Sequence, residues 1–298
     1  MLSVSKFLIA VYVCVDDLLL AVLRGQRLRR RGVPPKLSDA EVITMEIVGE
    51  VLGLDGDKAI WNYFRQHWLH YFPNLPSRSR FVRQAADLCH VKQLIHQHLV
   101  AAMGIMGRVV HVIDAFPMRV CRLARARRCR LFPGEAALGY CASQKEHYFG
   151  MKGHLLVDDA GRIQTLLMTP ANTDDRVHLL GIAANIRGVL IGDKGYIDLK
   201  KWQRLWQQGV QLKTPMRKNM KPRPAATSTK GQRKRRKVVE TVISQLQTRF
   251  NIGTIKARDT WHLTSRVARK VLAHTMLCLI NDLLSREPLH HDGLISIS

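Results

Sequence analysis

The sequence is poor in acidic residues. It has 23 Asp and Glu against 47 Lys and Arg, which gives a formal net charge of +24 and a pI near 10.4. A surface with such an excess repels itself unless it meets a polyanion. Solubility alone does not account for it, because small domains usually carry a net charge of magnitude about 2 to 8. The shortage of acids therefore predicts nucleic acid as the partner.

The chain also lacks an uninterrupted apolar run. Its most apolar stretch, residues 7–23, carries Asp16 and Asp17 at the centre, where each would cost about 2.5 to 3.5 kcal/mol in a bilayer. We interpret this stretch as an amphipathic helix and expect no membrane partner. Because no basic n-region or cleavage site accompanies it, we expect no export and a cytoplasmic location.

The cysteines are scattered, and their spacing does not suggest disulfides, which fits a reducing compartment. A zinc site built from Cys121, Cys129, Cys141 and His147 is disfavoured, because the pair spacing typical of zinc sites is missing. We expect reduced, partly buried thiols instead. The six cysteines are Cys14, Cys89, Cys121, Cys129, Cys141 and Cys278.

The N-terminal third has the pattern of helices. With 298 residues, 46% of them hydrophobic, the chain can form one large domain or two ordinary ones. Residues 1–36 form the amphipathic segment and a basic linker, and residues 37–106 carry three helical patterns. The first of these begins with Ser38 and Glu41, which have the spacing of a capping box. The other two are expected over about 56–71 and from Ser77 or Ser79 onward.

Three arginines, Arg78, Arg80 and Arg83, lie near the start of the last of these helices. Short helices with arginines in this place are typical of a helix-turn-helix-like DNA-binding region. A plain helical bundle with a solvated basic face gives the same pattern. Both interpretations remain open at this point.

Two short apolar runs end in carboxylates. Residues 109–118 contain a β-branched run that leads into Asp114, followed by a turn with Pro117. Residues 188–196 repeat the pattern, with Asp193 set between glycines. An acid that follows a buried strand lies at the rim of a sheet, where ligands usually bind. The two runs predict an α/β region with Asp114 and Asp193 as candidates.

The remaining strand and helix patterns complete this α/β region. Other acids have a structural interpretation: Asp158 and Asp159 lie in the turn of a hairpin, and Asp174 and Asp175 at a helix N-terminus. His111 and His154 are expected in the core or at a strand edge rather than as ligands. The patterns comprise strands at 147–157, 162–169 and 210–213 and helices at about 174–186 and 198–208.

A basic segment, residues 213–237, contains eleven Lys and Arg and no acid, and we expect a flexible loop there. It leads into a helix whose apolar stripe includes Val239 and Leu246. Glu240 lies next to this stripe, so we expect it to be half-buried. A further helix with an apolar face follows, from about Val267 to Leu283.

Asp114, Asp193 and Glu240 could together bind divalent cations. Phosphodiester chemistry on DNA uses two such ions about 3.5 to 4 Å apart, and Mg²⁺ prefers hard oxygen ligands. The alternative without a metal site is that the strand-end Asp residues cap turns and the helix Glu residue is solvated. Spacing alone leaves both interpretations open.

Three segments resemble the DDE transposases of bacterial insertion sequences, closest to the insertion-sequence 982 family. The resemblance covers about residues 37–284 and rests on the segments beginning VIDAFPMRV, LIGDKGY and RKVVETVISQL. The family pattern places its acids at I-D-x-F-P, G-D-K-G-Y and R-x3-E, which are Asp114, Asp193 and Glu240 here. Arg233 stands where related groups often have Tyr, and Gln247 where a Lys is expected.

The resemblance implies an α/β architecture, with an RNase H-like mixed-sheet catalytic domain after an all-α N-terminal DNA-binding region. The catalytic domain would span residues 107–286, with a basic insertion at 213–237 and a polar tail at 287–298. The implied activity is that of a transposase, an endonuclease that cuts insertion-sequence ends and joins the 3′-hydroxyl to target DNA. Mg²⁺ or Mn²⁺, two ions, would be held by the three acids.

The implied partner is double-stranded DNA, both terminal inverted repeats and target, bound by a homo-oligomer in the bacterial nucleoid. The Arg-rich run 119–130 and the loop 213–237 would supply contacts to the DNA backbone. Two alternatives remain: an RNase H-like nuclease or resolvase, and a non-catalytic DNA-binding protein derived from a transposase. The candidate DNA-binding residues are Lys194, Arg236, Arg233, Lys237, Arg217, Lys218, Arg78, Arg80 and Arg83.

Overall fold

The computed structural model describes residues 1–29, 31–216 and 227–296. The chain divides into two units by its internal contacts. Unit 1 comprises residues 1–102, 248–252 and 256–298, and unit 2 comprises residues 103–247 and 253–255.

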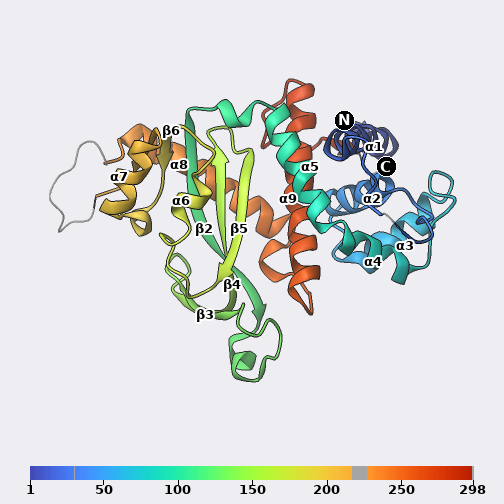
Figure 1. The fold of residues 1–298 in the computed structure, drawn as a ribbon, viewed down its shortest axis with the longest axis horizontal. Coiled ribbons are helices and arrows are strands. Elements are labelled where there is room, and N and C mark those ends of the chain that lie inside the picture. Colours follow the sequence, from blue (N-terminus) through green and yellow to red (C-terminus); the bar gives the residue numbers. More distant parts are fainter. Residues whose placement is uncertain (30, 217–226, 297–298) are drawn as a thin grey trace. The chain divides into compact units, whose positions relative to one another are not determined.

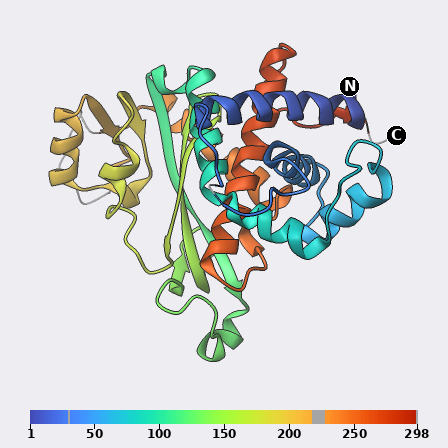
Figure 2. The same cartoon turned by 45° about the vertical axis from the view of Figure 1, so that its right-hand side comes forward.

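Unit 1 is helical, apart from one short parallel pair of strands that joins its two ends. Its helices α1, α2, α5 and α9 pack on one another, and Figure 2 shows α1 lying across the others. The helices are α1 (Val4–Leu23), α2 (Asp39–Val51), α3 (Asp57–His67), α4 (Arg78–Asp87), α5 (Cys89–Ala102) and α9 (Thr260–Leu283). The strands are β1 (Leu2–Ser3) and β8 (Ile295–Ser296).

The capping box at the start of α2 is confirmed. The Ser38 hydroxyl accepts from the Glu41 backbone N–H at 3.1 Å, and the Glu41 carboxylate accepts from the Ser38 backbone N–H at 2.6 Å. Helix α5 follows α4 almost directly and was not expected from the sequence.

Helix α9 belongs to unit 1, whereas the sequence predicted it as part of a catalytic domain ending at residue 286. It contacts α2, α4 and α5. An apolar helix face has the same sequence pattern whichever unit it covers, so periodicity could not assign this helix.

Unit 2 is built on a mixed six-stranded sheet (Figure 1). Its order is β3-β4-β2-β6-β7, with β5 paired to β4. Strand β4 runs antiparallel to β2, β3 and β5, whereas β6 is parallel to β2 and β7. The strands are β2 (Val110–Cys121), β3 (Ala137–Cys141), β4 (Glu146–Asp158), β5 (Ile163–Pro170), β6 (Gly188–Ile191) and β7 (Val210–Lys213).

The helices of unit 2 are α6 (Leu179–Ile182), α7 (Leu199–Gln207) and α8 (Lys230–Thr248). Side chains of α6 and α7 pack with those of β2, β4, β6 and β7 in one core, which includes Ile113, Leu156, Leu190 and Leu205. These contacts fix the end of β6, and with it the position of the residues that follow.

Three details of unit 2 differ from the sequence predictions. Strand β2 does not end at Pro117 but runs on to Cys121. Beyond Val112, its only strand partner in the described chain is β4. Among the described residues, the other edge of β2 is therefore unpaired there and tolerates a proline, which has no backbone N–H to donate. The helix expected over 174–186 is reduced to α6, because the Asp174 side chain accepts from the Arg176 backbone N–H at 2.9 Å and forms a turn instead. Residues 230–237, expected in a loop, already belong to α8.

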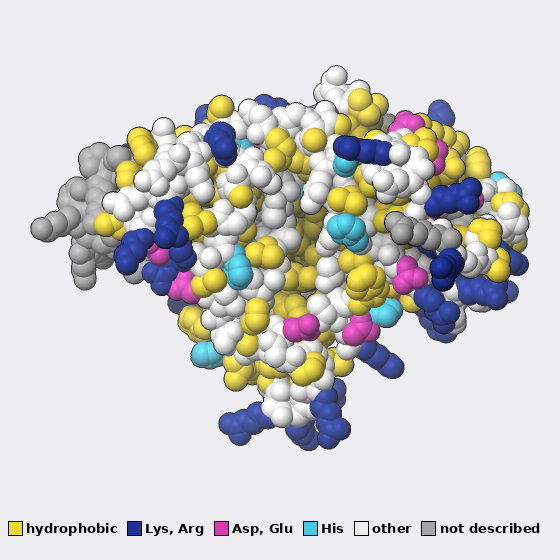
Figure 3. Space-filling model, in the orientation of Figure 1, with side chains coloured by type: hydrophobic (Ala, Val, Ile, Leu, Met, Phe, Trp, Pro, Cys, Tyr) yellow, Lys and Arg dark blue, Asp and Glu magenta, His cyan; other side chains and the backbone are white. Residues whose placement is uncertain are grey.

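The segment between β2 and β3 carries an exposed group of arginines. It includes a short 3₁₀ helix at Leu123–Arg128 with no buried residue. Figure 3 shows Lys and Arg side chains gathered at the lower tip of the view, where Figure 1 places this segment. The exposed arginines there are Arg122, Arg125, Arg127, Arg128 and Arg130.

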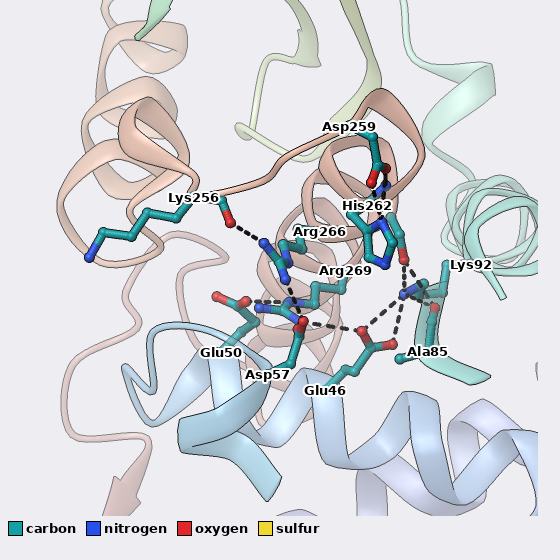
Figure 4. A network of polar contacts seen from close by, with 11 residues as sticks. Glu46, Glu50, Asp57, Ala85, Lys92, Lys256, Asp259, His262, Arg266 and Arg269 are labelled. Atoms are coloured by element: carbon teal, nitrogen blue, oxygen red, sulfur yellow. Dashed lines mark hydrogen bonds and ion pairs between the residues drawn. The ribbon is translucent and has the colours of Figure 1, made fainter. Parts of the chain in front are cut away.

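Buried ion pairs join α9 to its neighbours in unit 1 (Figure 4). The Arg269 guanidinium contacts Glu50 at 2.5 Å and also Asp57, and Lys270 contacts Glu50 at 2.7 Å. Because Arg269 and Glu50 are no more than 2% exposed, neither charge is solvated by water, and each depends on its partner.

A second group of contacts extends this network to α5. The Lys92 ammonium donates to both oxygens of Glu46, at 3.0 and 2.8 Å, and to the Ser265 hydroxyl at 2.7 Å. Arg266 contacts Asp57 at 2.6 Å. We refer to Glu46, Glu50, Asp57, Lys92, Arg266, Arg269 and Lys270 together as the buried charge network.

Candidate active site

Asp114 and Asp193 lie at the same level on neighbouring parallel strands, Asp114 within β2 and Asp193 just after the end of β6. The ladder between β2 and β6 ends with Val112 opposite Ile191, and each acid comes two residues later. Parallel strands keep their side chains in step from one strand to the next. The pairing thus brings both carboxylates to one edge of the β2–β6 ladder.

The backbone around Asp193 is held closely. Its carboxylate accepts from the Gly195 backbone N–H at 2.7 Å and caps the 3₁₀ helix at Lys194–Tyr196. A Cβ at Gly195 would lie 2.9 Å from the Asp193 carboxylate, and one at Gly192 would lie 3.0 Å from the Tyr196 ring. The two glycines therefore permit an approach that any other residue would obstruct.

Glu240 lies on α8 and is linked to Asp114 through Arg236. The Arg236 guanidinium contacts Glu240 at 2.8 Å, one helical turn away, and Asp114 at 3.3 Å. The Glu240 side chain is 50% exposed, so it lies further toward solvent than the position at the edge of the core that the sequence suggested. The apolar stripe of α8 is formed by Val239, Val242 and Leu246, and Glu240 points away from it.

The pKa of Asp114 reflects its burial first and the neighbouring charges second. Burial raises the pKa of Asp114 to about 6; the Ala115 backbone N–H and Arg236 oppose the shift, and Asp193 and Glu240 add to it. A carboxyl whose neighbours include two more acids gains from any cation placed between them.

The donor set fits a divalent cation such as Mg²⁺, because it consists of carboxylate oxygens with more negative than positive charge. In the described structure the three carboxylates do not all lie within 4.8 Å of one another. Arg236 instead contacts both Asp114 and Glu240. The three acids are therefore near one another, but their carboxylates are not close enough together to ligate a single ion in this conformation.

Sequence reasoning missed Asp175, which it had assigned to a helix N-terminus. A Cβ at Gly195 would lie 3.2 Å from the Asp175 carboxylate as well as close to Asp193, so the two acids are neighbours. Asp175 forms an ion pair with Lys152 at 2.8 Å. The signal in the sequence was a pair of acids soon after a strand, a pattern that a turn explains equally well.

Tyr196 was also missed. Its side chain is fully buried, and its hydroxyl has no hydrogen-bond partner in the described structure. Burial raises the pKa of Tyr196 well above its usual value, and Asp175, Asp114 and Asp193 add to the shift. The phenol therefore stays protonated beside the acids.

Most of the candidate DNA-binding residues are exposed. Arg217 and Lys218 lie outside the described residues. Arg236 is half-buried, and its guanidinium contacts the carboxylates of Asp114 and Glu240. The exposed candidates are Arg78, Arg80 and Arg83 on α4, Lys194 after β6, and Arg233 and Lys237 on α8.

The histidines of the sheet are buried, as expected. His111 bonds Gln164 and the Arg187 carbonyl, each at 2.9 Å, and His154 bonds Thr169 at 2.9 Å. Cys121, Cys129, Cys141 and His147 form no metal-ligand cluster within the described residues.

The family model described as "Transposase DDE domain" matches residues 103–260, more than half of the chain. The chain belongs to the transposase DDE domain family. The matched region of this transposase-domain protein contains Asp114, Asp193 and Glu240. A search of curated proteins and a search of solved structures found no match. None of the helices in the described ranges combines the length and apolar character that crossing a membrane requires.

Proposed function

We propose that this protein is a DNA transposase that cuts the ends of an insertion sequence and joins the freed 3′-hydroxyl to target DNA. The observation that carries the proposal is the β2–β6 ladder, which brings Asp114 and Asp193 next to each other just beyond its last pair, Val112 and Ile191. Arg236 adds Glu240 to this pair through its two contacts. The family match supports the same class of enzyme.

The strand order supports an RNase H-like catalytic unit. A central strand, β2, has an antiparallel hairpin, β4 and β5, on one side and the parallel strands β6 and β7 on the other. The resemblance to the insertion-sequence 982 family implies this fold for the catalytic domain. We propose it here together with that family membership.

Asp114, Asp193 and Glu240 are proposed to hold Mg²⁺ or Mn²⁺. When bound, two such ions activate the attacking oxygen and stabilise the leaving one. Arg236 partly neutralises the acids until the ions bind. The exposed cations Lys194, Arg233 and Lys237 are proposed to contact phosphates and so fix the DNA without reading its sequence.

The test is an assay with purified protein, Mg²⁺ or Mn²⁺, and DNA that carries the element's terminal repeats. We expect Asp114→Asn, Asp193→Asn and Glu240→Gln each to bind the ends but to lose cleavage and joining by at least about 1000-fold, since several kcal/mol of metal-assisted stabilisation are removed. The matched control is Asp159→Asn, which changes an exposed acid in the hairpin turn. Full activity in any one of the three variants removes that residue from the site.

Product analysis separates the alternatives. A substrate that already ends in a 3′-hydroxyl at the cleavage position reports joining alone. Cutting without joining indicates a nuclease or resolvase of the same fold. Binding with neither reaction indicates a DNA-binding protein that has lost catalysis.

A further inference from the structure

Three side chains of the kinds that ligate metals converge at the C-terminal half of α9 in unit 1. His274 and Cys278 stand one helical turn apart, and His291 comes from the segment that follows the helix. One ligand atom from each lies within 4.8 Å of the others, and all three residues are buried. Residues four apart share one face of a helix, so α9 supplies two ligands and the returning chain supplies the third.

The distances match those around one tetrahedral ion. The Cys278 Sγ lies 3.8 Å from the His274 Nδ1 and 3.9 Å from the His291 Nε2. Zinc bonds of about 2.3 Å to sulfur and 2.0 to 2.1 Å to nitrogen, at tetrahedral angles, would separate the sulfur and nitrogen atoms by about 3.6 Å. An ion could therefore enter with shifts of a few tenths of an ångström.

The segment that carries His291 is fixed independently of any ion. The Asn281 side chain donates to the carbonyls of Pro288 and His290, at 3.1 and 3.0 Å. Arg286 donates to the Asp292 carbonyl at 2.8 Å. The chain thus turns back onto the end of α9 and holds His291 next to Cys278, which makes the ligands preorganised.

Both imidazole rings are neutral at pH 7. Burial lowers the pKa of His274 well below its usual value, with His291 adding to the shift. Burial and Arg249 lower the pKa of His291 to about 4. A metal needs neutral imidazole and deprotonated thiol as ligands.

We propose that His274, Cys278 and His291 bind one Zn²⁺ ion, with a water molecule as the fourth ligand. Two imidazoles and a thiolate favour zinc over Mg²⁺, which prefers oxygen ligands. On binding, the Cys278 thiol loses its proton to solvent as the sulfur–zinc bond forms, so one proton is released per ion. The ion differs in chemistry from the ions proposed for the acids of unit 2.

The site would hold the segment after α9 against that helix. Residues 285–292 lead into β8, which pairs with β1. A coordination bond from His291 to an ion held by α9 would attach this segment to the helix, in addition to its hydrogen bonds. Because hydrogen bonds already hold this segment, we expect zinc to slow hydrogen exchange further at residues 284–296 and to leave exchange in the rest of unit 1 unchanged.

The test is metal binding to the full-length protein. After chelation and removal of the chelator, we expect one equivalent of Zn²⁺ to bind in the presence of excess Mg²⁺. One equivalent of Co²⁺ should give a thiolate-to-cobalt charge-transfer band and the intense visible bands of four-coordination. Because the acids of unit 2 contain no sulfur, this spectrum reports a cysteine ligand and is independent of DNA cleavage.

Paired variants sharpen the assignment. Cys278→Ser and His291→Gln should weaken zinc binding by more than about 100-fold, since losing even an outer partner of a ligand costs 10- to 100-fold. The controls are Cys89→Ser, which changes another buried cysteine of unit 1, and His290→Gln, which changes the exposed neighbour of His291; both should bind zinc normally.

Either of two results overturns the proposal. The first is the absence of stoichiometric zinc and of the cobalt–thiolate band in the unmodified protein, which would leave the cluster as buried side chains in thiol–imidazole contact. The second is a band that survives in Cys278→Ser, which would assign the metal to another cysteine.

Discussion

Both units gather carboxylates, but the two groups are neutralised differently. In unit 1, Glu46, Glu50 and Asp57 are almost fully buried and meet four cations of the buried charge network. In unit 2, the Asp114 and Glu240 side chains are 20% and 50% exposed, and Arg236 contacts both of them. Asp193 lies at the end of the neighbouring strand.

The difference separates acids that the fold pairs internally from acids that we propose to bind metal. Buried carboxylates must be paired within the fold, because water cannot reach them. Burial tends to raise the pKa of Asp57, but Arg269 and Arg266 outweigh it and lower the pKa to about 2. Around Asp114 the balance runs the other way, and its pKa rises to about 6. Acids that the fold leaves incompletely neutralised are those that a cation from solution can stabilise.

The largest expected effect comes from breaking the network of unit 1. Arg269→Met removes the guanidinium that contacts Glu50 and Asp57, which leaves both acids buried with fewer partners. We expect a loss of about 3 to 5 kcal/mol in the free energy of unfolding. Urea denaturation measures this loss against Arg258→Met, which changes an exposed arginine next to α9 and should cost less than about 0.5 kcal/mol. Equal stability of the two variants would show that the network is not structural.

The pH dependence of stability should have opposite signs at the two groups. The pKa of Asp114 is raised from 3.8 to about 6 in the folded state, so its stabilising effect is complete below pH 4 and is lost as the pH rises through 6. In metal-free buffer at pH 7, Asp114→Asn should therefore stabilise the protein by up to about 3 kcal/mol. The pKa of Asp57 is lowered from 3.8 to about 2, so its contribution is present above pH 4 and is lost as the pH falls to 2.

Asp57→Asn should accordingly destabilise the protein at pH 7, by about 2 kcal/mol. Unfolding free energies measured between pH 3 and 8 with a chelator present compare the two variants. A change of stability in the same direction at pH 7 in Asp114→Asn and Asp57→Asn would show that the two groups of acids do not differ in this way.

Local signals in the sequence predicted the strands and the helix that carry the acids of unit 2. They did not predict how exposed these acids are or which cation pairs with them. The strand at Asp114, the glycine-flanked Asp193 and the helical position of Glu240 depend on patterns within about ten residues, and the structure has these elements. The exposure of Glu240 and the double contact of Arg236 depend on packing across 122 residues of chain. No periodicity reports such a contact.

The network of unit 1 was not predicted for the same reason. The partners Glu46 and Lys92, and Glu50 and Arg269, are 46 and 219 residues apart. Each resembles a solvated charge on a helix when viewed alone. The capping box of α2, which involves Ser38 and Glu41, was predictable because both its partners lie in one turn.

The smallest expected effect tests whether a metal ion can take the place of Arg236 beside the acids of unit 2. Arg236 pairs with acids that are partly exposed, and such pairs are worth no more than about 1 kcal/mol. If it competes with metal for the same carboxylates, Arg236→Gln should tighten Mn²⁺ binding by about 2- to 5-fold in the absence of DNA. Calorimetric titration measures this against Arg233→Gln, which removes an exposed charge one turn earlier on α8 and so corrects for the change in net charge. Weaker Mn²⁺ binding in Arg236→Gln than in Arg233→Gln would mean that Arg236 organises the acids for metal, as the cations of unit 1 organise theirs, and the contrast between the two groups would narrow.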